Sequence, residues 1–471
     1  MNNESKTDKK NMTSGRLWDK ILFFALPVAA TAILGQLFNL ADVAVVGNFT
    51  GDLKTIAVAA VGANGPVIGL IVNFFIGISL GSNVVISRAV GKGDDETVTK
   101  AVHTSIALAV VGGILMMVLG ELIAPEVLKL LNVPDNVFPY ALDYLRIYLS
   151  GLPVILLYNF EAAIFRSIGK TRIPLVALTV SGIINVVFNL IFVIVFDLNV
   201  KGVAIATVIS NAISSVILSI ILLRTNSVIK VRLKKIRFDK ASLASIIKIG
   251  LPSGGQNAVF SISNIVIQSA INSLGDTVMA ASSAAFNIEI IAYYVISSFA
   301  QACTTFTGQN NGASKHKRCF QSYCWCLIES MIATLASVGL TLLIGKPLLS
   351  LFDNDPEVIK IGYTRLVIVF SSYLFCMLYE VTAGYLRGYG ISFTPALITT
   401  ICVCVVRILW INFVFPLYNT FAIIMIAYPV SLFLTSVCML IALAIFHPSK
   451  KNENLLATSS VPITVEDGES L

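Results

Sequence analysis

The feature that most constrains this chain is a series of uncharged stretches about as long as a membrane crossing. A helix needs roughly 20 apolar residues to cross the hydrocarbon core of a bilayer. Uncharged runs of this kind cover residues 21–41, 101–120, 173–196, 202–223, 249–275 and 388–406. Allowing one ionisable residue within a span adds segments near 55–87, 140–166, 278–307, 319–344 and 357–387. The run 408–449 completes the span that begins at 388 and supplies one more, so twelve transmembrane helices are expected.

Composition excludes the main alternatives to a helical membrane protein. Of the 471 residues, 56% are apolar and 13% are charged, whereas soluble domains are about a quarter charged. The apolar stretches do not alternate strictly with polar residues, as the strands of a membrane barrel do. Helices also satisfy their own backbone hydrogen bonds in lipid. The expected fold class is therefore an all-α polytopic membrane protein.

Internal repetition divides the twelve spans into two halves. A shift of about 221 residues superimposes Gly91 on Gly312, Arg166 on Arg387, Gly169 on Gly390 and Pro174 on Pro395. Each half then holds six spans, an even number, so both halves enter the membrane in the same direction as a parallel repeat. The expected units are an N-terminal tail (1–20), an N-terminal lobe (21–223), a basic linker (224–248), a C-terminal lobe (249–446) and a disordered tail (447–471).

Loop charges predict the orientation in the membrane, because Lys and Arg collect on the cytoplasmic side. On one side lie 25 of the 33 Lys and Arg residues, with Arg166 and Arg387 counted among its loops, and on the other side lie five. Both termini are therefore expected in the cytoplasm of a multi-pass cell-membrane protein. Polar residues fill positions 1–20, which argues against a cleaved signal peptide.

Signatures of enzymes and cofactors are missing from the sequence. The three histidines lie far apart and none belongs to an H-E-x-x-H motif. Gly169-Lys170-Thr171 resembles the end of a phosphate-binding loop, but Ile164 occupies the position where that motif needs glycine. The eight cysteines lack the ligand count of a zinc site. We therefore expect no enzyme activity, no cofactor and no nucleic-acid partner, and a chain that works as a monomer.

An ordered set of short motifs resembles the multidrug and toxic compound extrusion (MATE) transporters. The motifs are FNLADVAVVG, FRSIGKTRIP, GLPSGGQ, FTGQNNGASKHKR and LRGYGISFTP, and the resemblance runs from about residue 16 to residue 446. It implies a twelve-helix, two-lobed antiporter. Such a protein expels amphipathic, often cationic compounds in exchange for Na⁺ or H⁺, so organic cations are the expected substrates.

Polar residues in the first, fifth and sixth spans form the first candidate site. Asp42 is an ionisable residue inside a span, which is a functional hypothesis by default. Asn185 and Asn189 are four residues apart and so share a helix face, and Thr207 lies at a similar depth. Together these oxygens could coordinate Na⁺, or Asp42 alone could carry a proton. The alternative is that they only join helices by hydrogen bonds.

The resemblance implies the same four residues as a cation-coupling site. Many members have Asp where this chain has Asn189, so a second carboxylate is missing here. One negative charge still suffices to bind one monovalent cation or one proton. No other metal is expected.

The second candidate group lies in the C-terminal lobe. Glu289 and Arg407 fall at comparable depths and are a candidate ion pair. The resemblance implies a coupling or substrate role for Glu289 and Glu380, and Arg407 is a further candidate beside them, with structural pairing as the alternative. Further candidates for the lining of a cavity are Gln36, Asn39 and Gln256, with the aromatic residues Phe38, Tyr158, Tyr293, Tyr294 and Tyr379.

Two other functions are weighed against antiport. A flippase for lipid-linked precursors could share the two-lobed plan, but it would need a strongly basic cavity to hold a diphosphate. The sequence shows only Arg407 as a clear intramembrane cation. A membrane enzyme or receptor is disfavoured by the missing catalytic motifs and by the parallel repeat, which suits alternating access between two lobes.

Overall fold

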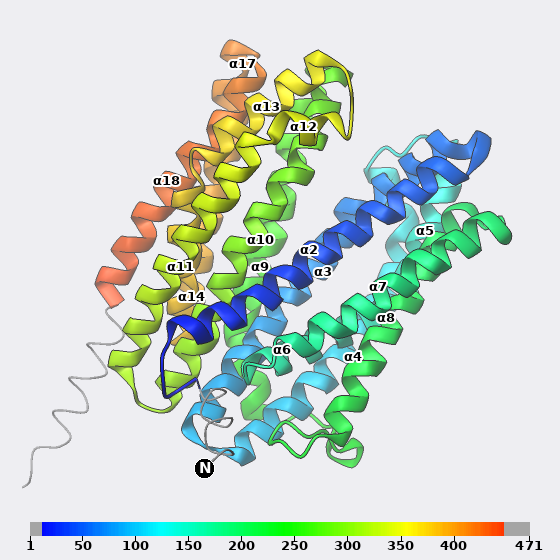
Figure 1. Cartoon of the computed structure of the whole chain (residues 1–471). Helices are drawn as coiled ribbons and strands as arrows, with labels where there is room; N and C mark the ends of the chain where they lie inside the picture. Colours follow the sequence, from blue (N-terminus) through cyan, green and yellow to red (C-terminus); the bar gives the residue numbers. More distant parts are fainter. Residues whose placement is uncertain (1–11, 447–471) are drawn as a thin grey trace, which may run out of the picture.

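The computed structural model describes residues 12–446, and all its regular structure in that range is helical. This confirms the all-α fold class. The predicted disordered tail, residues 447–471, and residues 1–11 of the predicted N-terminal tail lie outside the described residues. Figure 1 shows two groups of long helices that meet at the end where the described chain begins and diverge toward the opposite end.

Each lobe is built from one half of the chain. The N-terminal lobe contains α2 (Trp18–Phe49), α3 (Lys54–Lys92), α4 (Asp95–Leu130), α5 (Phe138–Ser150), α6 (Leu152–Ser167), α7 (Arg172–Leu190) and α8 (Asn199–Arg224). The C-terminal lobe contains α9 (Lys240–Asn272), α10 (Asp276–Gly312), α11 (His316–Leu343), α12 (Gly345–Ser350), α13 (Pro356–Phe370), α14 (Tyr373–Gly388), α15 (Phe393–Thr399), α16 (Val406–Leu409), α17 (Phe415–Tyr418) and α18 (Phe421–Phe446). Segments α15 to α17 form one continuous helical rod with π-helical turns between them.

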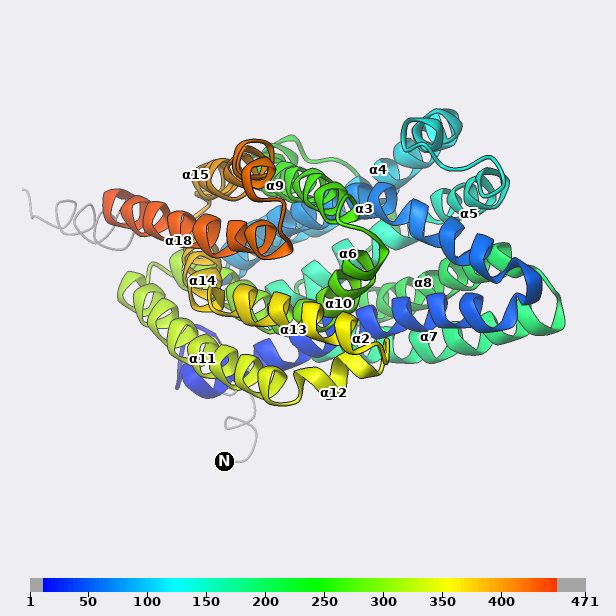
Figure 2. The ribbon, with the colours of Figure 1, turned by 90° about the horizontal axis from the view of Figure 1, so that it is seen from above.

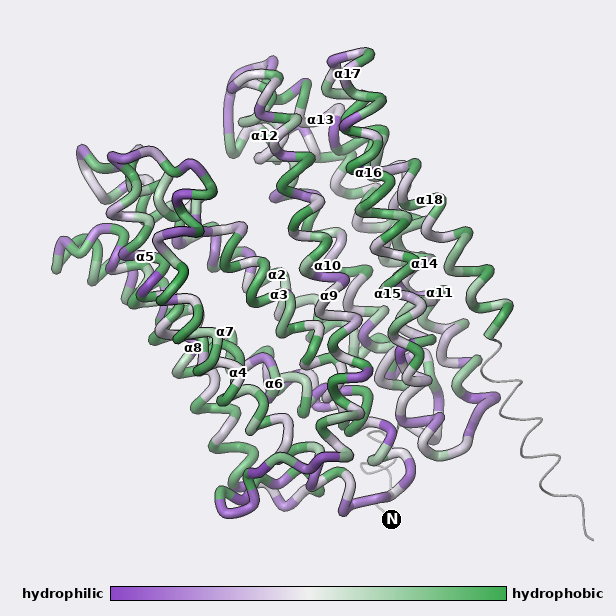
Figure 3. The backbone as a smooth tube through the Cα atoms, turned by 180° about the vertical axis from the view of Figure 1, so that it is seen from behind, coloured by the Kyte–Doolittle hydropathy of each residue, from purple (hydrophilic) through white to green (hydrophobic). Residues whose placement is uncertain are grey.

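The long helices reproduce the predicted spans. Among the described residues, nine helical segments are long and apolar enough to cross a membrane, and two bent pairs of helices add two more. The remaining predicted span corresponds to α9, which has 33 residues but is not among the helices apolar enough to be counted. Some of its polar residues, such as Gln256 and Asn264, face the space between the lobes. Hydrophilic segments gather at the two ends of the molecule, and apolar segments cover the middle (Figure 3).

The two bent pairs fall at equivalent positions of the repeat. Helices α5 and α6 meet at 50° beside Gly151, and α13 and α14 meet at 48° beside Ser372, which is 221 residues further along the chain. At the second bend the Ser371 and Ser372 hydroxyls donate to carbonyls three residues earlier, a local bond that competes with the helical pattern. The repeat seen in the sequence is therefore also a repeat of helix geometry.

The last part of the predicted linker is helical. The linker was expected to cover residues 224–248, and α9 begins within it, at Lys240. Asp239 caps this helix, because its carboxylate accepts a hydrogen bond from the Ser242 backbone N–H at 2.9 Å. Hydrogen bonds from the backbone and from the side chain of Ser242 hold the pKa of Asp239 below its usual range. The segment is fastened to α4 where the Arg232 backbone N–H donates to the His103 ring at 2.9 Å.

Close contact between the lobes is made by α2 and α3 on one side and α9 and α10 on the other (Figure 2). Glycines allow this approach: a Cβ on Gly77 would lie 2.3 Å from the Gly254 nitrogen, and a Cβ on Gly81 would lie 2.3 Å from the Ile246 carbonyl oxygen. We call this contact of Gly77, Gly81 and Gly91 with α9 and α10 the interlobe seam. Close backbone approach through small residues is a common way for membrane helices to associate.

Candidate functional site

A cavity of about 630 Å³ lies between the two lobes. Its walls come from α2, α3 and α6 of the N-terminal lobe and from α9, α10, α14, α16 and α18 of the C-terminal lobe. The volume falls within the range of pockets that bind drug-sized molecules. The seam borders the cavity, since Gly77 belongs to both.

The structure brings together the four N-terminal residues predicted as a coupling site. Asp42 of α2 is 6% exposed. Its Oδ1 accepts a hydrogen bond from Asn189 Nδ2 at 2.6 Å, and its Oδ2 accepts one from Thr207 Oγ1 at 3.0 Å. Asn189 Nδ2 also donates to Asn185 Oδ1 at 3.2 Å. We call these four residues the Asp42 cluster; it lies within the N-terminal lobe and does not line the cavity.

A glycine lets the helices of the Asp42 cluster approach one another. A Cβ on Gly182 of α7 would lie 1.8 Å from the Phe38 ring of α2. The ring of Phe38 therefore packs against bare backbone, which brings α2 against α7 one turn from Asp42. Phe38 does not line the cavity, unlike the other four aromatic residues predicted there.

Glu289 pairs with Arg365, and the predicted Glu289–Arg407 pair is wrong. Arg365 Nε lies 2.9 Å from Glu289 Oε2, with side-chain exposures of 3% and 8%. Arg365 also donates to Ser282 Oγ at 2.7 Å. No role was predicted for Arg365 from the sequence, and depth alone did not show which arginine faces Glu289.

We expect Glu289→Gln to destabilise the protein strongly. Removing the carboxylate leaves the buried Arg365 guanidinium without an opposite charge, which typically costs about 3–5 kcal/mol. Thermal unfolding of purified protein in detergent measures the effect as a fall in the midpoint. A double variant with Arg365→Met removes both charges and should recover most of the loss.

The matched control for that experiment is Glu121→Gln. Glu121 lies 3.5 Å from Arg146 in a pair whose side chains are 36% and 50% exposed, and exposed pairs contribute about 0–1 kcal/mol. Equal losses for Glu289→Gln and Glu121→Gln would contradict a structural role for the buried pair.

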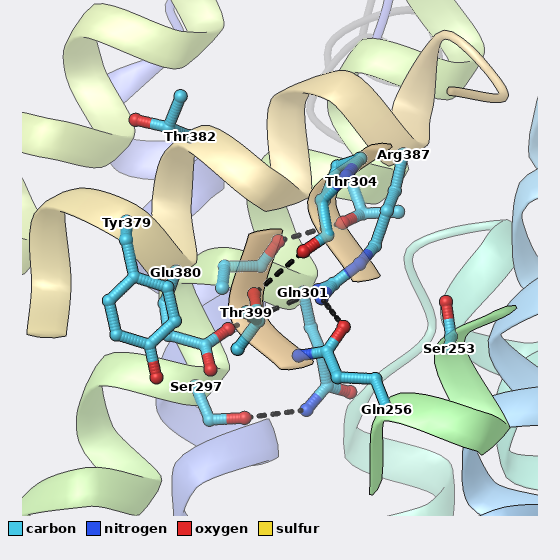
Figure 4. A network of polar contacts seen from close by, with 12 residues as sticks. Ser253, Gln256, Ser297, Gln301, Thr304, Tyr379, Glu380, Thr382, Arg387 and Thr399 are labelled. Carbon is cyan, nitrogen blue, oxygen red and sulfur yellow. Dashed lines mark hydrogen bonds and ion pairs between the residues drawn. The ribbon is translucent and has the colours of Figure 1, made fainter. Parts of the chain in front are cut away.

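Glu380 belongs to a second polar network, which lines the cavity (Figure 4). Arg387 Nη1 lies 3.9 Å from Glu380 Oε2, and Arg387 Nη2 donates to Gln256 Oε1 at 3.0 Å. Tyr293 donates its hydroxyl to Glu380 Oε1 at 3.2 Å. Two of the predicted residues, Glu380 and Gln256, thus meet through Arg387.

Two of the three arginines that line the cavity were not predicted there from the sequence. Arg407 lines the cavity as an intramembrane cation, but so do Arg166 and Arg387, which were assigned to cytoplasmic loops. Residues 166 and 387 are equivalent under the 221-residue repeat, and that equivalence was the signal that both could reach the same space. The Arg407 guanidinium lies 4.0 Å from the Tyr428 ring centre and donates to Ser431 Oγ at 2.9 Å.

Of the remaining predicted polar residues, one joins the cavity and one does not. Gln36 lines it, and its amide contacts Asn287 Oδ1 at 3.3 Å and the Tyr294 hydroxyl at 3.4 Å, which links α2 to α10. Asn39 is exposed and lies outside the cavity lining.

Glu161 of α6 was missed altogether. It is 0% exposed and accepts hydrogen bonds from the hydroxyls of Ser215 and Ser219 of α8. Within residues 12–446 no basic side chain forms an ion pair with it. The signal was a row of polar residues on α8 at every fourth position, Thr207, Asn211, Ser215 and Ser219, which share one helix face.

Comparison with known proteins adds a family match. The sequence profile described as MatE matches residues 27–191 and 252–413, one segment in each lobe. A probable multidrug resistance protein, YoeA of Bacillus subtilis, is 25% identical over 400 residues, which cover 83% of this chain and 85% of that protein. An FAD transporter of Shewanella oneidensis is 26% identical over 365 residues, 75% of this chain and 78% of that protein.

Solved structures agree with the fold. A multidrug resistance MATE family transporter of the MOP superfamily in an outward-facing conformation superimposes with a TM-score of 0.86. The match is 21% identical in sequence and covers 94% of this chain and 99% of that one. A MATE structure in complex with MaL6 also gives a TM-score of 0.86 at 21% identity, over 93% of this chain and 98% of that chain.

Proposed function

The chain belongs to the MatE family of multidrug efflux transporters, and from that premise we propose that it is a secondary antiporter that exports amphipathic small molecules in exchange for Na⁺ or H⁺. Family members are transport proteins and not enzymes. The observation that carries the proposal is the pairing of a drug-sized cavity between two lobes with a separate buried carboxylate cluster inside one lobe. The cavity would hold the cargo, and the carboxylate cluster would hold the coupling ion.

The interface between the lobes supports alternating access. Glycine contacts hold the seam closed at one end of the cavity, and hydrogen bonds also join the two lobes. Among them are the 3.1 Å bond from Thr305 to Asn83 Oδ1 and the 2.7 Å bond from Gln309 Nε2 to the Ser167 carbonyl. Rocking of one lobe against the other would open this end and close the diverging end.

The loop charges give this movement a direction. The seam lies toward the end of the molecule at which α2 begins (Figure 1), and the excess of Lys and Arg predicts that this end faces the cytoplasm. The described conformation would then be open to the outside of a cell membrane and closed to the cytoplasm.

The Asp42 cluster has the oxygen donors that a monovalent cation needs. Asp42 Oδ1 and Asn185 Oδ1 both accept hydrogen bonds from Asn189 Nδ2, and the Thr207 hydroxyl donates to Asp42 Oδ2, so the oxygens of the cluster lie close together. Asn189 Oδ1 is buried and has no hydrogen-bond partner in the described part of the chain. Turning the Asn189 amide by 180° would exchange its nitrogen for this oxygen, since the two amide orientations differ only in the hydrogen-bond network that they form. With that turn the cluster would suit Na⁺; as it stands, it would accept a proton on Asp42.

The acidic residues of the C-terminal lobe are better explained by structural pairing than by coupling. Glu289 forms a buried pair with Arg365, and Glu380 faces Arg387. An organic cation would need an acidic side chain to bind, and both acids of the cavity already face arginine. The arrangement therefore does not favour the predicted preference for organic cations. The diphosphate-binding flippase is not favoured by the family match, although the cavity holds more arginine than the sequence indicated.

Dye movement in vesicles tests the proposed function. Purified protein is reconstituted into liposomes, and a Na⁺ gradient or a H⁺ gradient is imposed separately. Rhodamine 123, a cation, and fluorescein, an anion, share the same three-ring body and serve as alternative cargo. We expect one of the two gradients to drive at least one dye against its own gradient, and an ionophore that collapses the driving gradient to stop it.

Protein-free vesicles supply the background. Movement of neither dye under either gradient, by protein that is shown to be folded, would contradict antiport of amphipathic molecules.

A further inference from the structure

The cavity between the lobes carries more positive charge than its acids neutralise. Five charged side chains line it: Arg166, Arg387, Arg407, Glu289 and Glu380. Glu289 is already paired with Arg365, which does not line the cavity. Glu380 is the single acid left to face three arginines, and its contact with Arg387 is long, at 3.9 Å.

Two of these arginines lack an acidic partner. Within the described range, no ion pair is formed by Arg166 or Arg407. Arg407 is only 4% exposed, and its contacts are a neutral hydroxyl, Ser431, and the ring of Tyr428. An unpaired guanidinium in so little water is costly unless a counter-charge arrives. The hydrogen bond to Ser431 and the cation–π contact with Tyr428 do not neutralise the charge of Arg407.

Hydrogen-bond donors in the cavity are also unsatisfied. Arg387 is 8% exposed, and its Nε has no hydrogen-bond partner among residues 12–446. The Tyr158 hydroxyl, on the opposite wall and 8% exposed as a residue, has none either. Guanidinium N–H groups form a planar fork that matches carboxylate and phosphate oxygens. An anionic group between the lobes would therefore satisfy hydrogen-bond donors that are unused on both of them.

The rest of the lining suits flat, apolar rings. Aromatic side chains on both lobes border the cavity: Tyr158, Phe260, Phe286, Tyr293, Tyr294, Tyr373, Tyr379 and Tyr428. Aromatic faces pack against planar ring systems, and a volume of about 630 Å³ accommodates a molecule of several rings.

We propose that the cargo of this cavity is an aromatic anion, a planar ring system that carries a carboxylate or a phosphate, which the arginines of both lobes bind. The proposal rests on the proposed function, because it takes the cavity as the cargo path. Arg166 contributes from the N-terminal lobe, and Arg387 and Arg407 contribute from the C-terminal lobe. An organic cation would add a further positive charge beside two unpaired ones. An anion that bridges the lobes would also be released when they move apart.

Equilibrium binding to protein in nanodiscs of uncharged lipid tests this without any gradient. The probes are fluorescein, an anion at pH 8, and rhodamine 123, a cation with the same three-ring body, read by fluorescence anisotropy. Nanodiscs without protein give the background. We expect fluorescein to bind at least about tenfold more tightly than rhodamine 123, the ratio that corresponds to one net charge-assisted hydrogen bond. Competition by 2-naphthoate and by 1-naphthyl phosphate then shows whether carboxylate or phosphate is preferred.

Variants locate the binding. Arg407→Gln and Arg166→Gln should each weaken fluorescein binding about tenfold or more. The matched control Arg146→Gln, at an exposed position outside the cavity, should leave it unchanged. Using two arginines from different lobes keeps the test valid if one variant fails to fold, and thermal unfolding identifies such a variant.

Tighter binding of rhodamine 123, no binding of either dye, or fluorescein binding that neither cavity variant weakens would each overturn the proposal. The binding measurement uses no ion gradient, so its failure leaves antiport intact. Failure of the vesicle experiment together with arginine-dependent fluorescein binding would instead contradict the antiport mechanism and retain the anion site.

Discussion

Asp42→Asn is expected to abolish ion-driven transport, down to the level of protein-free vesicles. The substitution keeps the size of the side chain and an oxygen that accepts a hydrogen bond from Asn189 or Thr207. It removes the single negative charge of the Asp42 cluster, because this chain has an amide at position 189. A neutral amide neither takes up a proton nor balances a bound cation, so the ion gradient no longer drives the cycle. Gradient-driven dye movement in the reconstituted system measures the loss.

Asp52→Asn is the matched control. Asp52 is exposed in the turn that follows α2, and the same change of charge there should leave transport unchanged. Dye binding without a gradient should also survive Asp42→Asn, because Asp42 does not line the cavity. Normal gradient-driven transport by folded Asp42→Asn protein would remove Asp42 from the coupling mechanism.

The second large effect is expected at the interlobe seam. Gly81→Leu places a branched side chain where even a Cβ would lie 2.3 Å from the Ile246 carbonyl and 2.8 Å from the Gly250 nitrogen. Both neighbours are backbone atoms that cannot rotate aside, so the seam can close only if the lobes separate at that end. We expect the variant to lose transport and to favour the conformation in which the seam is open. Spin labels at positions 52 and 353 lie on the diverging ends of the two lobes. Pulsed electron paramagnetic resonance should report a shorter distance between these two labels than in the parent protein.

Gly62→Leu tests whether the effect comes from the contact or from the residue type. Gly62 lies on the same helix, α3, but has no neighbouring atom within 4 Å of a Cβ. Leucine favours the helix over glycine at both positions by about 1 kcal/mol. Transport by Gly62→Leu should therefore match the parent, and an unchanged label distance in Gly81→Leu would show that the seam does not control the conformation.

Candidate residues were predicted from the sequence with different success in the two lobes. In the N-terminal lobe, Asn185 and Asn189 share a helix face by spacing, and Asp42 is a rare charge in an apolar span; the structure places these groups within hydrogen-bond distance. In the C-terminal lobe, Glu289 was matched with Arg407 by depth alone, whereas its partner is Arg365. Depth along a helix can be counted from a sequence, but the direction in which a side chain points around the helix depends on packing.

The helical character, the approximate spans and the twofold repeat could be predicted from the amino-acid sequence, because each depends on local hydropathy and on regular spacing along the chain. The sequence also identified the family, through motifs spread over both lobes, and the family profile confirms it. Which charged side chains meet could not be predicted in this way, because it depends on how the helices pack. Arg166 and Arg387 lie at the ends of their spans, so the sequence counts them as loop residues. In the structure both line the cavity between the lobes, and each lies on one of the two bent helix pairs, with bends at Gly151 and Ser372. The net charge of that cavity comes from side chains on helices of both lobes, so it depends on how the helices pack against one another.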